Sequence, residues 1–343
     1  MRFPVALANP IPLYLAPMAG VSESPFRRLC RRFGADVVVT EFLSAEGIRR
    51  ENEATIAKLR FGPDEHPIGV QIFGSDPIAM GDAAALVTDV FAPDFIDINF
   101  GCPVKKVVKR NGGSGCLKDL TLVADIIKGV LARTHLPVTA KIRSGWNEET
   151  RDPVKIARVC EDAGAAVIAL HARSRTQMYS GKANWDEIAA VVNAVSVPVL
   201  GNGDISSAAD VFRMHEHTNC AGVMVGRGSF GQPWVFDQAR ALLDGKPMPA
   251  APAVAERFAI ALDHARMADA YELDQRGAAI EFRKHLGWYV KGLPGSAELR
   301  KRLHAVTSLM EVEGIFADYL AAVARGDVDQ RRASERDAET LAA

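Results

Sequence analysis

The sequence predicts a (β/α)8 TIM barrel, in the α/β class, followed by a small all-helical C-terminal domain. Short apolar runs alternate with amphipathic segments over the first two thirds of the chain, and strand-like runs cease beyond the Gly- and Pro-rich stretch 244–252. Nearly continuous apolar runs are typical of parallel strands that are buried on both faces. We therefore expect a catalytic barrel over residues 1–245, a helical domain over 246–324 and a polar tail over 325–343.

The alternation predicts eight strands, which are Leu13–Ala16, Val37–Thr40, Ile68–Phe73, Phe95–Asn99, Val138–Ile142, Val167–His171, Val197–Leu200 and Gly222–Val225. Between them, helical spacing of apolar residues predicts Thr121–Arg133, Pro153–Asp162, Trp185–Val195 and Ala208–Glu216. After residue 252 the same spacing predicts three or four helices, over Val254–Tyr271, Ala278–Tyr289 and Glu298–Val323. A doubly wound sheet is the alternative architecture, but it would favour fewer strands and a GxGxxG after the first strand, which the sequence lacks.

Composition excludes several classes of protein. The chain has 343 residues, 48% of them hydrophobic, with 41 Lys+Arg against 42 Asp+Glu, so neither a disordered chain nor a uniformly basic surface is expected. Apolar runs stay below the about 18 residues of a membrane span, and four prolines interrupt the apolar N-terminal stretch. Five cysteines without a CxxC pair argue against a disulfide framework or a zinc site. We expect a cytoplasmic monomer with no metal and no membrane association.

Two glycine-containing loops follow the last two expected strands. They read Asn202-Gly203-Asp204 and Gly226-Arg227-Gly228. In a (β/α)8 barrel these loops commonly form a phosphate site, because glycine lets backbone N–H groups approach phosphate oxygens and arginine adds a charge-assisted bond. The alternative interpretation is that the glycines only make tight turns.

Two basic side chains accompany these loops. Lys141 lies within an apolar strand, where an unpaired ammonium is costly, so it must face an anion or an electron-rich ring such as a reduced flavin. A pair with Asp97 or Glu41 is the alternative. His171 ends an expected strand beside the phosphate loops, which favours a functional role over that of a core histidine.

A cysteine lies in a Gly-Cys-Pro turn directly after the fourth expected strand. An unperturbed thiol has a pKa of about 8.5, so Cys102 is mostly protonated at neutral pH, as a general acid must be. Cys116, in a Gly-Ser-Gly-Cys segment, is the competing candidate. We therefore predict that Cys102 donates a proton.

The helical domain contains a concentrated basic segment. Between Arg283 and His304 there are six Lys or Arg residues against the single acid Glu298, a local net charge of +5 in a nearly neutral chain. Such a segment is typical of a surface that contacts nucleic-acid phosphates. Trp288 and Tyr289 lie within it, and either base stacking or helix packing would account for them.

Several motifs together resemble the tRNA-dihydrouridine synthases. They are PMAG (17–20), SPFR (24–27), the D-x-N-x-GCP run (97–103), KIRSGW (141–146), HARSRTQ (171–177), NGDI (202–205) and GR (226–227). The segment RKHLGWYVKGLPG (283–295) resembles the helical domain of the bacterial B-type branch, and the resemblance spans roughly residues 10–320. Phe100 and the segment 110–116 depart from the pattern, and that segment borders the substrate.

The resemblance implies an enzyme that holds FMN at the barrel mouth, is reduced by NADPH, and reduces the C5=C6 bond of specific uridines in tRNA to 5,6-dihydrouridine. Hydride would pass from the reduced flavin to C6, and Cys102 would protonate C5. The positions matching FMN contacts are Pro17, Met18, Ala19, Gln71, Lys141, His171, Asn202, Gly203, Asp204, Gly226 and Arg227. On the substrate side we expect Asn99, Arg143, Arg173, Arg175, Arg283, Lys284, Arg300, Lys301 and Arg302.

Two other classes of protein stay open at this point. A flavin-dependent oxidoreductase of free pyrimidines, of the dihydropyrimidine or dihydroorotate type, would share the cysteine chemistry but would need no basic helical domain. A non-catalytic RNA-binding barrel would need no flavin. The sequence does not specify the modified uridine, the choice between NADPH and NADH, or whether ribosomal RNA is also a substrate.

Overall fold

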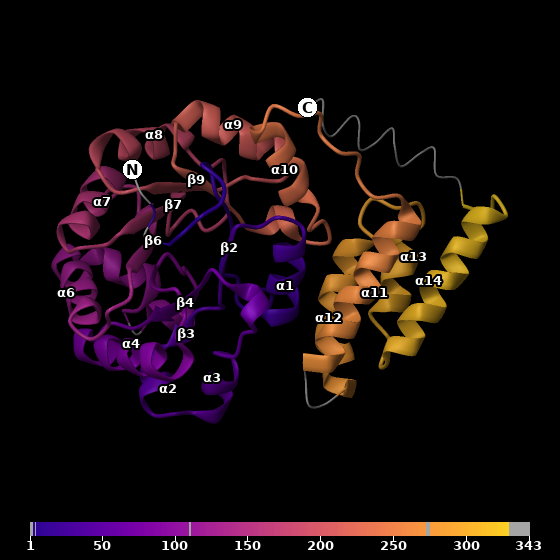
Figure 1. Ribbon diagram of the computed structural model, residues 1–343, viewed down its shortest axis with the longest axis horizontal. Coiled ribbons are helices and arrows are strands. Elements are labelled where there is room, and N and C mark those ends of the chain that lie inside the picture. The colour runs from indigo at the N-terminus through magenta and orange to yellow at the C-terminus, as the bar shows by residue number, and fades with distance from the viewer. Residues whose placement is uncertain (1–2, 4, 110, 272–274, 329–343) are drawn as a thin grey trace. The chain divides into compact units, whose positions relative to one another are not determined.

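The computed structural model describes residues 3, 5–109, 111–271 and 275–328 (Figure 1). The chain divides into two compact units, Met1–Gly228 with Val235–Met248, and Ser229–Trp234 with Pro249–Ala343. Of the polar tail expected over 325–343, residues 329–343 lie outside the described residues.

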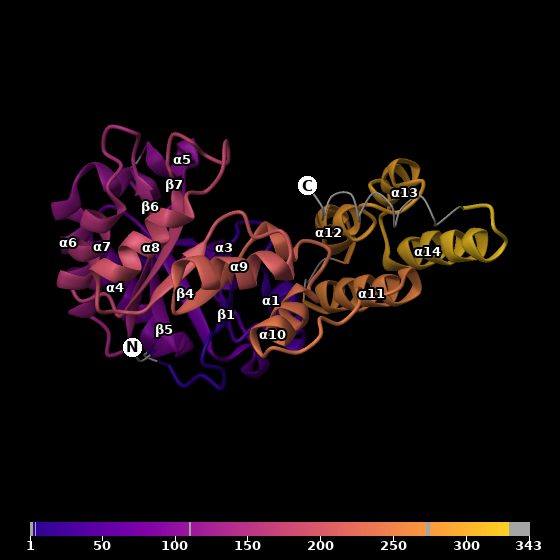
Figure 2. The same cartoon turned by 90° about the horizontal axis from the view of Figure 1, so that it is seen from above.

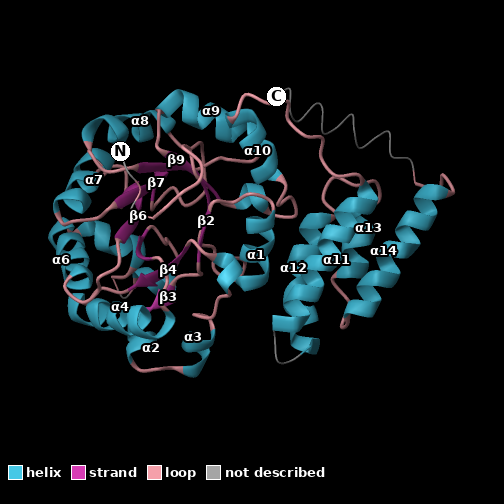
Figure 3. Ribbon diagram, in the orientation of Figure 1, coloured by secondary structure: helices cyan, strands magenta, loops and turns pink. Residues whose placement is uncertain are grey.

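In its described residues, the first unit is built on nine strand segments, all paired in parallel. They are β1 (Leu13–Leu15), β2 (Val37–Val39), β3 (Leu43–Ser44), β4 (Ile68–Phe73), β5 (Phe95–Phe100), β6 (Val138–Gly145), β7 (Val167–Ser174), β8 (Val199–Asn202) and β9 (Gly222–Val225). Eight of them form a closed ring in the order β1-β2-β4-β5-β6-β7-β8-β9, because β9 pairs back with β1 (Figure 3). The predicted (β/α)8 barrel is confirmed, and β3 is an additional short segment paired with β4.

Three strands predicted from the sequence end too early by more than one residue, and the one expected over Val197–Leu200 is β8 (Val199–Asn202), so Asn202 lies in the strand. Strand β6 continues to Gly145 and β7 to Ser174, so His171 lies inside its strand rather than at its end. The cause is extended pairing, since Arg143 lies opposite His171 and, after a register shift, Gly145 lies opposite Ser174. The polar residues of these strands are therefore held by the sheet rather than by loops.

Ten helices belong to this unit in the described part of the chain. They are α1 (Ser24–Arg32), α2 (Ala45–Arg49), α3 (Glu53–Ala57), α4 (Pro77–Phe91), α5 (Lys105–Val108), α6 (Leu120–Leu131), α7 (Pro153–Asp162), α8 (Trp185–Ala194), α9 (Ala208–Thr218) and α10 (Val235–Leu243). Local signals start several of them: Asp76 caps α4 ahead of Pro77, and Ser207 forms a capping box with Asp210 in α9. The longer helices surround the ring of strands (Figures 1 and 3).

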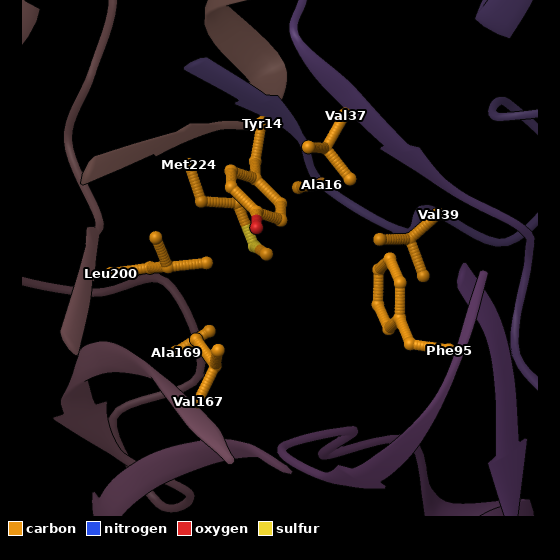
Figure 4. Close-up of a cluster of buried hydrophobic side chains, with 9 residues drawn as sticks. All are labelled: Tyr14, Ala16, Val37, Val39, Phe95, Val167, Ala169, Leu200 and Met224. Atoms are coloured by element: carbon orange, nitrogen blue, oxygen red, sulfur yellow. The ribbon is translucent and has the colours of Figure 1, made fainter. Parts of the chain in front are cut away.

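The barrel interior changes from apolar to polar along the strands. Tyr14, Val39, Phe95, Leu200 and Met224 belong to one buried cluster that converges on the barrel axis (Figure 4). Alternate residues of a strand share a face, so the interior positions after Phe95 on β5 are Asp97 and Asn99. Their register partners on β6 are Thr139 and Lys141, and the next interior position of that strand is Arg143. The chemistry-bearing side chains thus gather toward the carboxyl ends of the strands, the end at which α5 lies in Figure 2.

The described residues of the second unit form four helices, α11 (Val254–Tyr271), α12 (Gln275–Tyr289), α13 (Ser296–Leu303) and α14 (Leu309–Ala324). The segment Glu298–Val323, predicted to be helical, forms two helices because the chain breaks between α13 and α14, and the total of four agrees with the expected three or four. Ser308 caps α14, and Arg283 of α12 donates hydrogen bonds of 2.8 and 2.6 Å to the carbonyl of Val306 in the connection. Phe258 and Phe316 stack at 4.0 Å in the core of this unit.

None of the described helices combines the length and the apolar character that crossing a bilayer requires.

Candidate active site at the barrel mouth

The turn that carries Cys102 is fixed on both sides. Asn99 accepts hydrogen bonds at Oδ1 from the backbone N–H groups of Gly101 and Cys102, at 3.0 and 2.8 Å. The carbonyl of Cys102 accepts from the backbone N–H and the hydroxyl of Ser114, at 3.1 and 2.8 Å. Gly113 permits this closure: its φ is +57°, and a Cβ there would lie 2.9 Å from the Cys102 carbonyl oxygen.

The thiol of Cys102 suits proton donation. Burial raises its pKa above the ordinary value, so it is protonated at neutral pH. Its residue keeps 7% of its surface exposed, whereas Cys116 is fully buried and donates its thiol to the carbonyl of Asn111 at 3.0 Å. Burial raises the pKa of Cys116 to about 12. Of the two candidates, Cys102 is the one that a ligand at the mouth can reach.

Lys141 projects into the same region from β6. Its ammonium donates to Oδ1 of Asn202 at 3.0 Å, and the Nδ2 of Asn202 donates to the carbonyl of Met224. Burial, together with the neighbouring charge of Arg143, lowers the pKa of Lys141 to about 8, which leaves it mostly protonated at pH 7. The pairing with Asp97 or Glu41 considered from the sequence is replaced by this amide contact. None of the described ion pairs therefore joins the Lys141 ammonium to a carboxylate.

His171 is neutral. Burial lowers its pKa well below the ordinary value, and the positive charges of Lys141, Arg143, Arg173 and Arg227 lower it further. Arg173 approaches its Nε2 at 3.3 Å, and because a guanidinium only donates, Nε2 accepts and the ring proton lies on Nδ1. His171 is thus a hydrogen-bond donor through Nδ1 throughout the physiological pH range.

Two arginines expected to contact substrate are buried instead. Arg143 is 2% exposed and donates to the carbonyls of Gly101, Ser174 and Met178 at 2.8–2.9 Å. Arg173 is 1% exposed and binds both carboxylate oxygens of Asp204, at 2.7 and 2.8 Å. The charge of Arg173, which was expected on the substrate side, instead joins the loops after β7 and β8.

Arg175 follows β7 in a different setting. It is half-buried, and its guanidinium lies 4.5 Å from the ring centroid of Trp146. The ammonium of Lys118 lies 4.1 Å from the same ring centroid. The loops after β5, β6 and β7 therefore meet at the Trp146 indole, against which the cations of Lys118 and Arg175 pack.

The two glycine-containing loops are shaped by close packing. Gly203 has a φ of +122°, and a Cβ there would approach Ala183 and His171 to 2.8 and 3.0 Å. Asp204 also accepts from the backbone N–H of Ala183 at 2.7 Å, so both Arg173 and the loop after β7 use its carboxylate, which remains partly exposed. Arg227 is exposed, with its guanidinium 4.6 Å from the ring centroid of Tyr179.

The remaining FMN-contact positions lie at neighbouring strand ends. Pro17 and Met18 are half-buried and Ala19 is exposed just after β1. Strand β1 pairs with β9, and a Cβ on Gly226 after β9 would lie 3.7 Å from the sulfur of Met18. Gln71 of β4 is fully buried beside Asp97 and Asn99. The ring of strands thus brings the predicted set, scattered over more than 200 residues of sequence, to one end of the barrel.

The basic residues of the second unit are not equivalent. Arg283 donates to the carbonyl of Val306 in the connection before α14. Arg302 pairs with Asp318 at 2.7 Å, and Lys284 is half-buried. Arg300 and Lys301 are exposed in the last turn of α13. Tyr289 is fully buried and Trp288 stacks on Phe230 at 4.1 Å, so packing accounts for both aromatic residues.

Sequence reasoning missed Ser114, Thr139 and Tyr179. The signal for Ser114 was the glycine-rich run that surrounds it, which was noticed only as a departure from the family pattern. Thr139 is two residues before Lys141 on one strand, a spacing that places both on the same face. Tyr179 lies in a loop and carries no local signal.

The fold and the site define a barrel enzyme with a protonated thiol and an excess of positive charge at the carboxyl ends of its strands. The family model described as Dihydrouridine synthase (Dus) matches residues 14–324. The chain belongs to the dihydrouridine synthase family, whose members are flavin-dependent oxidoreductases.

Relatives match along most of their length. The chain is 39% identical over 293 residues to a protein of Pseudomonas aeruginosa named tRNA-dihydrouridine synthase B, covering 85% of this chain and 87% of that one. It is 36% identical over 312 residues to a protein of Rickettsia conorii named probable tRNA-dihydrouridine synthase, covering 91% of this chain and 94% of that one.

Solved structures show the fold alone. The amine oxidase HisD of Pseudomonas geniculata N1 superposes with a TM-score of 0.53 and 12% identity, covering 71% of this chain and 48% of that one. Histamine dehydrogenase of Rhizobium sp. 4-9 gives 0.51 and 12%, covering 72% and 47%. The chain thus spans about half the length of each of these two proteins.

Proposed function

We propose that the chain is a tRNA-dihydrouridine synthase, which reduces the C5=C6 bond of specific uridines in tRNA to 5,6-dihydrouridine with FMN and NADPH. The observation that carries the proposal is the protonated Cys102, held by Asn99 and Ser114 at the mouth of a barrel lined with cations. Family membership and the names of the relatives support it.

The residues at the mouth fit a flavin mononucleotide. FMN combines a phosphate with a ring system that becomes anionic on reduction, and the charges of Lys141, Arg143, Arg173 and Arg227 favour both. Lys141 would lie against the ring and stabilise the negative charge, and His171 would donate from Nδ1 to an acceptor on the cofactor. Arg227, being exposed beside its glycine neighbours, would bind the phosphate.

The chain's own residues then complete the reduction of the uracil. When bound and reduced, FMN would provide the hydride that C6 of the uracil accepts. Cys102 delivers the proton that C5 requires, and its raised pKa keeps that proton available at neutral pH. Arg143 holds the carbonyl of Gly101, and Asn99 holds the adjoining backbone N–H groups, so the thiol is presented in one geometry.

The division of labour follows the two parts of the chain. We assign catalysis to residues 1–245 and tRNA binding to the helical region 246–324. Exposed Arg300 and Lys301 supply charge for phosphate contacts in that region.

The test is a reconstitution with purified protein. We expect yellow protein that releases FMN on denaturation, is bleached by NADPH, and forms dihydrouridine in tRNA from a strain deleted for the gene, detected by mass spectrometry of nucleosides. Wild-type tRNA serves as the control, and comparison of the two RNAs maps the modified position. Absence of flavin uptake would contradict the site assignment. Turnover of free uracil or orotate without turnover of tRNA would favour the free-pyrimidine class.

A further inference from the structure

A chain of buried hydrogen bonds connects the barrel interior to the Cys102 turn. Asp97 accepts at Oδ2 from the Nε2 of Gln71 at 2.5 Å. The Oε1 of Gln71 accepts from the Nδ2 of Asn99 at 2.7 Å. The Oδ1 of Asn99 in turn accepts from the backbone N–H groups of Gly101 and Cys102. Asp97, Gln71 and Asn99 are 4%, 0% and 6% exposed, so water does not offer competing partners.

Asp97 sets the donor-to-acceptor direction of this series of hydrogen bonds. A carboxylate can only accept, so the amide nitrogen of Gln71 must face Asp97 and its oxygen must face Asn99. That oxygen draws the amide nitrogen of Asn99 toward it, which leaves the oxygen of Asn99 for the two backbone donors. If Gln71 flipped, its nitrogen would face Asn99, and Asn99 would then point a donor at the backbone N–H groups of Gly101 and Cys102. Both hydrogen bonds from the turn to Asn99 would be lost.

The stability of the fold does not explain the carboxylate. Asp97 lies within the barrel without a described ion pair, although Tyr14 of β1 and Lys141 of β6 face it electrostatically. Burial raises its pKa to about 6, which shows that the interior disfavours its charged form. Its second oxygen accepts from Thr139 at 2.5 Å, a bond that a neutral side chain could also make. The feature specific to a carboxylate is that both of its oxygens are acceptors.

We propose that Asp97 is a positioning residue for the uridine reduction, which acts through Gln71 and Asn99 to hold the Cys102 thiol in its proton-donating geometry. The proposal rests on the proposed function and adds to it a residue outside the predicted cofactor and substrate sets. No described hydrogen bond or ion pair joins Asp97 to Cys102, so Asp97 acts only by setting the orientation of two amide groups.

Asp97→Asn in the holoenzyme tests the proposal with little change of volume. The introduced amide can present either its oxygen or its nitrogen to Gln71, so the direction of the chain is no longer enforced. We expect reduction of the flavin by NADPH within about twofold of wild type, and re-oxidation by tRNA at least about tenfold slower in kcat with little change in KM, since a misplaced general acid loses part of its usual contribution.

A second variant tests whether the orientation of the amide groups, rather than the charge at position 97, is what matters. In the double variant Asp97→Asn with Gln71→Glu, the carboxylate moves to position 71, where one oxygen accepts from the introduced amide at position 97 and the other from Asn99. The direction of the hydrogen-bond chain is restored, and we expect the rate of Cys102 alkylation to recover; this readout is used because Gln71 is also a predicted FMN contact. Glu65→Gln is the matched control. Glu65 is also a fully buried carboxylate, but it is paired with Arg27 at 2.6 Å and takes no part in the hydrogen bonds that link Asp97 to Cys102. This control should leave re-oxidation unchanged per folded, flavin-loaded protein.

The rate at which iodoacetamide alkylates Cys102, followed by peptide mass mapping, reports a change in the presentation of the thiol and needs no RNA. We expect the rate to change at least about twofold in Asp97→Asn and to return in the double variant. Re-oxidation and alkylation both within twofold of wild type in Asp97→Asn would overturn the proposal, as would failure of the double variant to recover the alkylation rate. If wild type itself does not reduce tRNA, the proposed function fails, while the alkylation comparison still decides whether Asp97 positions the thiol.

Discussion

Replacing Asp97 by Asn is expected to stabilise the chain at neutral pH, although it removes a side chain that makes two buried hydrogen bonds. Burial raises the pKa of Asp97 from 3.8 to about 6, and the hydrogen bonds from Thr139 and Gln71 only partly offset this. The folded state therefore binds the proton more tightly than the unfolded state does. Between these two pKa values the free energy of unfolding falls as pH rises, and above about pH 6 the full penalty is present.

The size of the effect follows from the shift. Each pKa unit corresponds to about 1.4 kcal/mol, so a rise from 3.8 to about 6 amounts to about 3 kcal/mol. Asn cannot ionise and is free of this penalty. The variant should match wild type near pH 4 and exceed it by up to about 3 kcal/mol near pH 7. A hydrogen bond weakened by the change from carboxylate to amide subtracts about 1 kcal/mol from the gain.

The assay is urea unfolding of the full chain without added cofactor, followed by tryptophan fluorescence at several pH values between 4 and 8. The quantity of interest is the difference between variant and wild type, because the other titrating groups cancel in it. Glu65→Gln provides the opposite sign, since it leaves Arg27 buried without its partner. An Asp97→Asn variant that is less stable than wild type by a constant amount at every pH would refute the reasoning.

Three further predictions concern the proposed reaction. Lys141→Met should weaken FMN binding or slow flavin reduction, which an absorbance titration measures. The cofactor-free fold should be at least as stable as wild type in thermal melting, because burial disfavours the charged ammonium and lowers the pKa of Lys141 to about 8. Cys102→Ala should keep FMN and its reduction by NADPH but slow transfer to tRNA by about 10²–10⁴-fold in stopped-flow traces, whereas Cys116→Ala should transfer normally. Loss of transfer in Cys116→Ala alone would reverse that assignment. Replacing Arg300 and Lys301 by Ala should reduce the slope of log affinity for tRNA against log salt by about one unit per lost contact, and an unchanged slope would mean that these residues only solvate their helix.

Local sequence was sufficient for the architecture because parallel strands and amphipathic helices have short-range signatures. The helix predicted over Pro153–Asp162 matches α7 residue for residue, and Val254–Tyr271 matches α11. The break after α13 was not predictable from spacing, because apolar residues continue at helical intervals through it. It depends on Arg283, a residue of another helix, taking up the carbonyl of Val306.

The candidate site divides in the same way. Cys102, Lys141 and Asn99 were identified from the sequence because each stands at or near a strand end in a recognisable motif. The sequence could not show that Arg143 and Arg173 turn inward. Arginine at a strand end is compatible with a substrate contact or an internal one, and the distant carbonyl and carboxylate partners that decide between them are set by tertiary packing.

The sequence by itself thus determined the barrel, the helical region after it and the set of chemical groups at the strand ends, since periodicity and short motifs are properties of neighbouring residues. The tertiary structure decided which partner each group has. Lys141 meets the amide of Asn202 instead of a carboxylate, and Asp97 is linked to the Cys102 turn through Gln71 and Asn99. These relations depend on the register between strands, which brings residues tens of positions apart in sequence within hydrogen-bonding distance.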